Sequence, residues 1–365
     1  DRRAWGWVEH LRHGGTTPWA DWAGSAESGG AVVPGAQQLE LLRRLNQAGA
    51  PAPVLVDRVL GASAPGRGQP DLELVGAAPE SPFGPRPVDP ETLNEAELLR
   101  VAASILAEDV VTAGLPAPPK VVRPRPWRRP YRLHGDPELV APIRAELVAR
   151  GRPPGGRAPV HVILATDLGR MLAHLWTNRA FDGRITGWRS WLGRLERNGA
   201  LPRQIDPLHL ARTRTGRAAP DQVHIVLDTR TLPSLVGVRR LGASPSEPAA
   251  EAPDLARRVG SVLGLLVPAN QRKKLMHRTL RPWLAEVSGS ALAVPAEHQG
   301  WVGDHAARIA EGLSRAGYAV HGDLGGLALV RRPGAEAPAP RTTLALAMRM
   351  MLAGQSGADT TEEES

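Results

Sequence analysis

Two apolar runs constrain the fold of this chain more than any other feature of its sequence. Val160–Ala165 and Val223–Asp228 are short, rich in valine and isoleucine, and separated by segments with helical spacing of apolar residues. Runs of this kind are typical of parallel strands whose two faces are both covered by helices. The sequence therefore predicts an α/β fold, with a mostly parallel doubly wound sheet and helical N- and C-terminal flanking regions.

Other segments extend the same strand–loop–helix pattern. Tyr131–Leu133 is a third strand candidate, followed by a turn at His134–Pro137, and Gly317–Asp323 is a short strand and turn. Apolar residues at helical spacing predict helices over 37–46, 54–60, 95–113, 138–150, 168–179, 188–195, 255–265, 272–287 and 303–316. The helices thus lie on both sides of the predicted sheet in the sequence.

Composition divides the chain into five regions. We expect a Trp- and Gly-rich segment over 1–30, a helical and Pro/Gly-rich region over 31–120, and the α/β core over 121–265. A helical C-terminal region over 266–335 and a tail over 336–365, whose end is disordered, complete the prediction.

The chain is strongly basic, with a net charge of +8 and a pI of about 10.8. Of its 45 basic residues, only Lys120, Lys273 and Lys274 are lysines. Two interpretations stay open: the arginines reflect GC-rich codon usage, or they favour anionic partners such as a nucleotide, another small anion or nucleic acid.

The chain contains no cysteine, which excludes disulfides, thiolate chemistry and cysteine-ligated zinc. No apolar run approaches the length of a membrane span, and the nearest, Ser261–Pro268, is far too short. The first residues lack the apolar stretch of a signal peptide, although a leader removed before Asp1 stays open. We expect a cytoplasmic protein without a membrane span; the oligomeric state stays open.

Ligands of doubly wound sheets bind beyond the carboxyl ends of the strands. This rule points to His134–Asp136, Thr166–Arg170 and Asp228–Arg230. Asp167 has two interpretations: it caps the following helix, or the helix N-terminus with Arg170 receives an anion.

Several motifs are informative because they are incomplete or missing. His10 and His13 have a spacing seen in metal sites, but no carboxylate or cysteine cluster completes it, so we expect no metal. His-Gly-Asp occurs at His134–Asp136 and again at His321–Asp323, either as a histidine–carboxylate pair or as an ordinary turn. Nucleophile-elbow, Walker-type and dinucleotide-binding glycine motifs are missing, which counts against serine hydrolases, P-loop ATPases and typical Rossmann dehydrogenases.

Val160–Leu172 combines a buried strand with a Thr-Asp-Leu turn and a helix. The aromatic and basic residues that follow it are Trp176, Arg184, Trp188 and Trp191. In these features this part of the chain resembles bacterial sulfotransferase-like proteins, a P-loop-type family. Val223–Asp228 and Leu255–Gly264 are similar to the later part of the same fold, so the resemblance covers about residues 158–265.

The resemblance implies the donor 3′-phosphoadenosine 5′-phosphosulfate. In the family its 5′-phosphosulfate sits in a Lys-Ser-Gly-Thr-Thr type loop, and the counterpart here is His13-Gly14-Gly15-Thr16-Thr17. By this resemblance Gly14, Gly15, Thr16 and Thr17 bind phosphate, Asp167 and Arg170 belong to the donor site, and His10 or His13 is the catalytic base.

The sequence departs from the family at two charged positions. The loop lysine is missing, and Thr166 stands where the family has the arginine that holds the 3′-phosphate. Both departures remove positive charge where a polyanion needs it, so a degraded donor site or a non-catalytic relative is expected, and whether the chain is an enzyme stays open. Gly14–Thr17 also has the interpretation of an ordinary turn.

Two alternatives from other functional classes remain. The chain could be a non-enzymatic protein that binds nucleic acid or another polyanion through the basic stretch 120–132 and the cluster Arg272–Lys274. It could also be a structural protein that docks a partner chain through its helical flanks and exposed N-terminal tryptophans.

Overall fold

The computed structural model describes residues 2–26, 32–62, 71–77, 87–118, 122–124, 129–183, 185–215, 220–242 and 247–354. The chain forms two compact units. Unit 1 combines Asp1–Pro116, Asp254–Ala285 and Ala339–Ser365, and unit 2 combines Ala117–Pro253 with Glu286–Pro338. Each unit is therefore built from segments that are not contiguous in the sequence.

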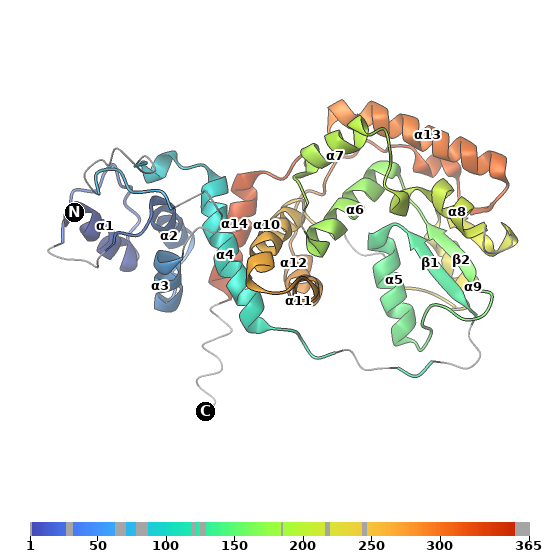
Figure 1. Cartoon of the computed structure of the whole chain (residues 1–365), viewed down its shortest axis with the longest axis horizontal. Helices are drawn as coiled ribbons and strands as arrows, with labels where there is room; N and C mark the ends of the chain where they lie inside the picture. Colours follow the sequence, from blue (N-terminus) through green and yellow to red (C-terminus); the bar gives the residue numbers. More distant parts are fainter. Residues whose placement is uncertain are drawn as a thin grey trace. The chain divides into compact units, whose positions relative to one another are not determined.

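Unit 2 contains a parallel sheet (Figure 1), in which the described residues form four strands. The strands are β1 (Tyr131–Gly135), β2 (Val160–Leu164), β3 (Val223–Val226) and β4 (Ala319–His321). They lie side by side in chain order, and every neighbouring pair is parallel. The predicted α/β class is confirmed, and the short strand expected within Gly317–Asp323 is β4.

Helices cover both faces of this sheet. The helices of unit 2 are α5 (Pro137–Ala149), α6 (Leu168–Asp182), α7 (Trp188–Arg197), α8 (Pro207–Thr215), α9 (Leu232–Val236) and α13 (Gln299–Ala316). Val162 points to the face that packs against α5 and α9, and its neighbour Ile163 points to the opposite face, against α6, α7, α8 and α13. Because successive strand residues alternate between two buried faces, the strand must be apolar throughout.

An aspartate follows every strand of the sheet and caps the next helical turn. The side chains of Asp136, Asp167, Asp228 and Asp323 accept backbone N–H groups of the turns that begin after β1, β2, β3 and β4. Such a cap satisfies one of the amides that the first helical turn leaves without a partner. The polar residues at this edge of the sheet thus have a structural role in common.

The two edge strands end in the same tripeptide, His-Gly-Asp, and in each case the histidine pairs with a histidine of the neighbouring strand. His134 Nε2 lies 3.1 Å from Nδ1 of His161 on β2, with the two ring planes nearly parallel. His321 Nε2 lies 3.0 Å from Nδ1 of His224 on β3. The repeated motif therefore links each edge strand to its inner neighbour.

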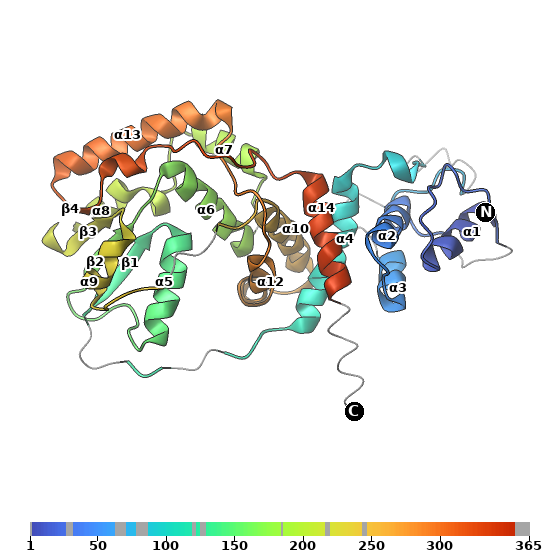
Figure 2. The same cartoon turned by 180° about the vertical axis from the view of Figure 1, so that it is seen from behind.

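Unit 1 is helical in its described residues. Its helices are α1 (Arg2–Arg12), α2 (Ala36–Ala48), α3 (Pro53–Gly61), α4 (Glu95–Ala113), α10 (Glu251–Leu266, which starts three residues before the unit boundary), α11 (Ala269–Leu275), α12 (Arg281–Ala285) and α14 (Pro340–Ala353). A π-helical turn over Met276–Leu280 joins α11 to α12. Helices α4 and α14 lie side by side (Figures 1 and 2) although they are far apart in the sequence.

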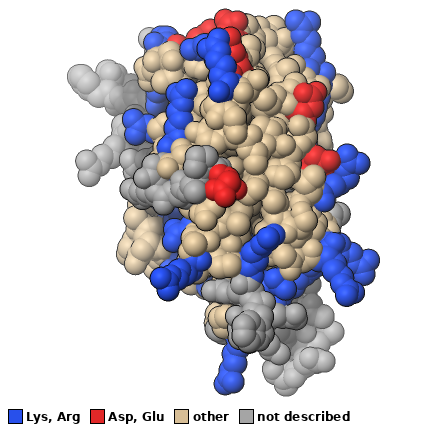
Figure 3. All heavy atoms as spheres, turned by 90° about the vertical axis from the view of Figure 1, so that its right-hand side faces the viewer, with Lys and Arg blue, Asp and Glu red and all other residues tan. Residues whose placement is uncertain are grey.

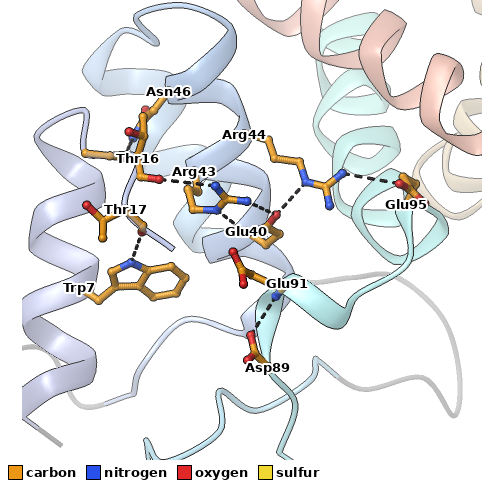
Figure 4. Close-up of polar contacts among 11 residues, drawn as sticks. Trp7, Thr16, Thr17, Glu40, Arg43, Arg44, Asn46, Asp89, Glu91 and Glu95 are labelled. Atoms are coloured by element: carbon orange, nitrogen blue, oxygen red, sulfur yellow. Dashed lines mark hydrogen bonds and ion pairs between the residues drawn. The ribbon is translucent and has the colours of Figure 1, made fainter. Parts of the chain in front are cut away.

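A buried ion-pair cluster lies on α2 (Figure 4). Glu40 is fully buried and accepts hydrogen bonds from Arg43 Nε at 2.7 Å and from Arg44 Nε at 2.8 Å. Arg44 also approaches Glu95 at the start of α4, at 3.9 Å. A buried carboxylate is tolerated only with such partners, so the two arginines belong to the packing of α2.

The helix over 95–113 has the bounds that its apolar spacing predicts, whereas two helices of unit 1 are not predicted from the sequence. Helix α1 lies in the segment 1–30, which is characterised from the sequence only as Trp- and Gly-rich, and α14 lies in the region expected to be a tail. The predicted disorder of Thr360–Ser365 lies outside the described residues. Across the described part of the chain, no helix has both the length and the apolar character needed to cross a membrane.

Candidate functional site

A cavity of about 600 Å³ opens in unit 2 beside the first two turns of α6. Helix α6 contributes Arg170, His174 and Thr177 to its wall, and Asp167, in the turn after β2, also lines it. The remaining wall comes from loops around Glu247, from residues 291–294 and from residues 329–336. The cavity therefore lies where the rule for parallel sheets places ligands.

Asp167 is the cap of α6. Its Oδ1 accepts the Arg170 N–H at 3.0 Å, and the residue is only 3% exposed. Burial raises the pKa of the Asp167 carboxyl, while the Arg170 amide and the Arg332 and Arg170 guanidinium groups act in the opposite direction. The cap interpretation of Asp167 is thus correct, and its second oxygen, Oδ2, is buried without a hydrogen bond.

Two arginines and two carboxylates form a chain of ion pairs along the cavity wall. Arg170 Nε lies 2.5 Å from Glu247 Oε1, and Arg332 contacts both Glu247, at 3.3 Å, and Asp167, at 3.2 Å. The contacts to Arg170 Nε and to Asp167 Oδ2 have ion-pair distances but not the alignment of hydrogen bonds. The charges are therefore close together, and their hydrogen-bonding capacity is only partly used.

A histidine–aspartate pair lies in the same wall. His174 Nδ1 is 2.7 Å from Asp136 Oδ2 and 2.9 Å from Oδ1. Asp136 is fully buried, and its Oδ1 also accepts the Glu138 N–H at the start of α5. The Asp136 N–H donates to Leu164 O at the end of β2, so the carboxylate is held by both neighbouring elements.

The sequence-predicted segments at the strand ends do not all meet at this cavity. Asp167 and Arg170 line it, and Asp136 reaches it through His174. Asp228 and Arg230 instead pair with each other at 2.9 Å, and Arg230 lines a separate cavity of about 350 Å³.

The predicted base candidates lie in unit 1, not in the α/β unit. His10 Nε2 lies 3.1 Å from Thr17 Oγ1, and its ring stacks on Trp22 at 4.5 Å. His13 is exposed, and its Nδ1 approaches Glu9 O at 2.9 Å. Among the described residues, no group of three or more histidines and carboxylates has the arrangement of a metal site.

The predicted phosphate loop follows the C-terminus of α1 (Figure 4). The amides of Gly14 and Gly15 donate to carbonyls of Leu11 and His10, and thus end α1. The carbonyls of the loop accept hydrogen bonds from neighbouring side chains: Asn46 donates to Gly15 O, Arg43 to Thr16 O and Trp7 to Thr17 O. A phosphate loop normally offers free amides and leads into a helix, so phosphate binding at Gly14–Thr17 stays a prediction without geometric support in unit 1.

The tryptophans that the sequence singled out pack mainly inside the units. Trp176, Trp188 and Trp191 lie in the core that covers one face of the sheet, with ring centroids 5.7–5.8 Å apart. Trp7 and Trp19 of unit 1 are buried against each other at 5.3 Å. Arg184, which belongs to the resembling segment, lies outside the described residues, as do Lys120, Arg125 and Arg128 of the basic stretch.

Most cavity residues were not predicted from the sequence, and His174, Glu247 and Arg332 are the ones among them that form its ion pairs. His174 follows Arg170 by four residues on a predicted helix, a spacing that places both side chains on one helical face. That spacing was a usable signal. Glu247 and Arg332 come from irregular segments, in which no periodic pattern indicates that the two residues lie in the same site.

Comparisons with protein families, with curated proteins and with solved structures find no match to this chain.

Proposed function

We propose that unit 2 binds a small anionic molecule carrying phosphate or sulfate groups in the cavity beside α6. The observation that carries the proposal is the position of the cavity beyond the carboxyl end of β2, with Arg170, Arg331 and Arg332 in its wall. A 3′-phosphoadenosine nucleotide is the first ligand to test, because the resemblance over residues 158–265 implies it.

The size and the lining of the cavity support this proposal. Its volume of about 600 Å³ falls within the ~300–1,000 Å³ of typical small-molecule sites. The lining combines apolar residues such as Val294 and Leu329 with the charged side chains of α6 and the loops. A ligand there would contact an apolar surface and a few convergent charged groups, as small-molecule sites require.

The arginines of the cavity can contact a bound anion, either because they have no ion-pair partner or because their carboxylate partner can be displaced. Arg331 is exposed and forms no ion pair with the described residues. Arg170 and Arg332 share the single carboxylate of Glu247, whose side chain is 26% exposed and reachable from solvent. A phosphate or sulfate offers guanidinium groups more acceptor oxygens than Glu247 does, so it can take over these contacts.

A calorimetric titration with adenosine 3′,5′-bisphosphate at low salt tests the proposal. We expect saturable binding, which Arg170→Ala weakens by about tenfold or more, because a charge-assisted hydrogen bond contributes roughly 1.5–3 kcal/mol. Glu247→Gln should tighten binding, because it removes the carboxylate that competes for Arg170 and Arg332.

The control variant is Arg230→Ala. Arg230 lies at the same edge of the sheet and also pairs with a capping aspartate, but its side chain is 89% exposed and it lies outside this cavity. Its removal lowers the charge by the same amount and should leave the affinity unchanged. Equal losses for Arg170→Ala and Arg230→Ala, or no saturable binding, would contradict the proposal. If only Thr16→Ala weakened the binding of the bisphosphate, the binding site would be the loop Gly14–Thr17 and not the cavity.

The polyanion alternative predicts a different result. Figure 3 shows a face on which lysine and arginine side chains lie in separate groups with uncharged surface between them. Nucleic-acid binding should appear as affinity for an oligonucleotide that falls steeply with salt and is unaffected by Arg170→Ala. That outcome would replace the small-molecule proposal.

A further inference from the structure

The buried pair His174–Asp136 gives the cavity a group that anion binding alone does not require. Asp136 accepts the Glu138 N–H and faces His174 Nδ1 with both of its oxygens. Because an ionised carboxylate only accepts hydrogen bonds, the histidine proton belongs on Nδ1. The lone pair of the neutral ring is then on Nε2, at the edge of the ring away from Asp136.

The contacts of His174 with Asp136 use Nδ1, so Nε2 is the nitrogen that a bound ligand or water in the cavity can reach. His174 lines the cavity and is 5% exposed, while Asp136 on its other side is fully buried. Within the described residues, the hydrogen bonds of the His174 side chain all go to Asp136, so no serine or threonine hydroxyl is bound to Nε2. A proton taken up by Nε2 must therefore come from solvent or from a ligand. An oriented histidine with a free nitrogen in a cavity is the arrangement of a general base.

We propose that the cavity of unit 2 is a hydrolytic site for phosphosulfate or related anhydrides, with His174 as general base and Asp136 as the residue that positions it. The inference rests on the proposed binding function. A water molecule gives a proton to His174 Nε2 while its oxygen attacks the sulfur of the bound phosphosulfate. The bond from sulfur to the bridging oxygen breaks, and the nucleotide phosphate leaves with the electron pair. The imidazolium then returns its proton to solvent, so the products are sulfate and a nucleotide phosphate.

The surrounding charges suit this step. Arg170 and Arg332 lie in the same wall and can neutralise the charge that grows on the leaving phosphate. The carboxylate of Asp136 stabilises the imidazolium that forms, at a distance of 2.7 Å from its Nδ1. Each residue of the wall thus has a separate role: the arginines hold the anion, and the histidine moves the proton.

The experiment measures sulfate release from 3′-phosphoadenosine 5′-phosphosulfate by the full chain. We expect release above the buffer rate, and His174→Gln should lower it by about 10²–10⁴-fold, the usual contribution of a general base. The affinity for adenosine 3′,5′-bisphosphate should stay unchanged in this variant. The matched control is His298→Gln, since His298 Nδ1 also pairs with a carboxylate, Glu196, at 2.6 Å but does not line the cavity.

Asp136→Asn tests the positioning role, because an asparagine can still cap α5. We expect slower release and a pH–rate profile whose acid limb moves to lower pH, since the imidazolium loses its carboxylate partner. A merely structural role would leave the shape of the profile unchanged.

The outcomes separate this inference from the proposed function. If the bisphosphate binds but sulfate release equals the buffer rate, or is the same in His174→Gln, the hydrolytic role is wrong and the binding site remains. If the bisphosphate does not bind, the proposed function fails and the hydrolytic role fails with it.

Discussion

At the end of β1 the backbone passes through Gly135 with a φ of 100°, a region that residues with a side chain rarely adopt. A Cβ at this position would lie 2.0 Å from Leu164 O, a backbone atom of the neighbouring strand. Gly135 therefore permits both the turn toward Asp136 and the close approach of β1 to β2. These two conditions together bring the Asp136 carboxylate within hydrogen-bonding distance of His174 Nδ1.

Gly135→Ala should destabilise unit 2 strongly. Strain at positive φ costs roughly 1–2 kcal/mol, and the contact with Leu164 O adds about 1–3 kcal/mol. Urea unfolding followed by tryptophan fluorescence measures the loss. The control is Gly155→Ala, because Gly155 has a φ of 102° but no atom within 4 Å of its added Cβ. If both variants lose the same stability, the close approach of the strands has no energetic role.

At this scale, the site could be predicted only in part. The rule for parallel sheets leads to Asp167 and Arg170 because they directly follow a recognisable strand. Glu247 and Arg332 reach the cavity from loops far away in the sequence, and only the folded chain brings them to Arg170. His10 and His13 were chosen through a resemblance, and the structure places them in unit 1 with their own local partners.

At the scale of elements, the two histidine pairs connect neighbouring strands on opposite faces of the sheet. The pKa of His134 is lowered to about 4, mainly by burial, with smaller contributions from the charges of Arg214, His161, Arg132 and Arg144. Burial is also the main cause of the lowered pKa of His161, and the charges of Arg214 and Arg132 add to it. The pKa of His224 is lowered mainly by burial and also by His321 and Arg129, whereas Asp221 acts to raise it. An N–H···N bond between imidazoles needs at least one neutral ring, so the fold favours the unprotonated state.

The stability of unit 2 should therefore depend on pH. The unfolded chain takes up protons on these histidines near their ordinary pKa of about 6.5, whereas folded His134 does so near 4. Between these values the unfolded state binds more protons, so stability is full above about pH 6.5 and falls as the pH drops toward 4. His134→Gln should flatten this dependence in urea unfolding at several pH values, and His209→Gln, outside both pairs, should not. An unchanged slope in His134→Gln would contradict the role of the pair.

The elements themselves were predicted unevenly, for a physical reason. Helix α4 has a long apolar pattern and an Asn94 cap, so its bounds follow from local signals. Helix α14 has only a short run of apolar residues at helical spacing, in a segment whose composition resembles a tail. Its apolar face is buried by packing against α4, a contact that the local sequence does not indicate. Helix α1 buries Ala4, Trp7, Val8 and Leu11, which lie at helical spacing, so this local signal was present in the sequence and was missed.

At the scale of the whole molecule, unit 1 depends on residues from the end of the chain. Leu344, Leu346 and Met351 of α14 are buried within unit 1. Leu346→Ala should lower the free energy of unfolding of unit 1 by roughly 2–5 kcal/mol, the usual cost of removing a buried leucine. Arg349→Ala, on the exposed side of the same helix, should change it by less than about 0.5 kcal/mol. Denaturant unfolding of the full chain distinguishes the two, and equal effects would mean that α14 contributes no packing.

The partnership of α4 and α14 also has a consequence during protein synthesis. About 230 residues separate the end of α4 from the start of α14. At ~5–20 residues per second, the ribosome needs roughly 10–45 s to supply the second helix after the first has emerged. The residues of α4 that pack against α14 therefore lack this partner while all of unit 2 is translated, and apolar surface exposed on a nascent chain promotes aggregation.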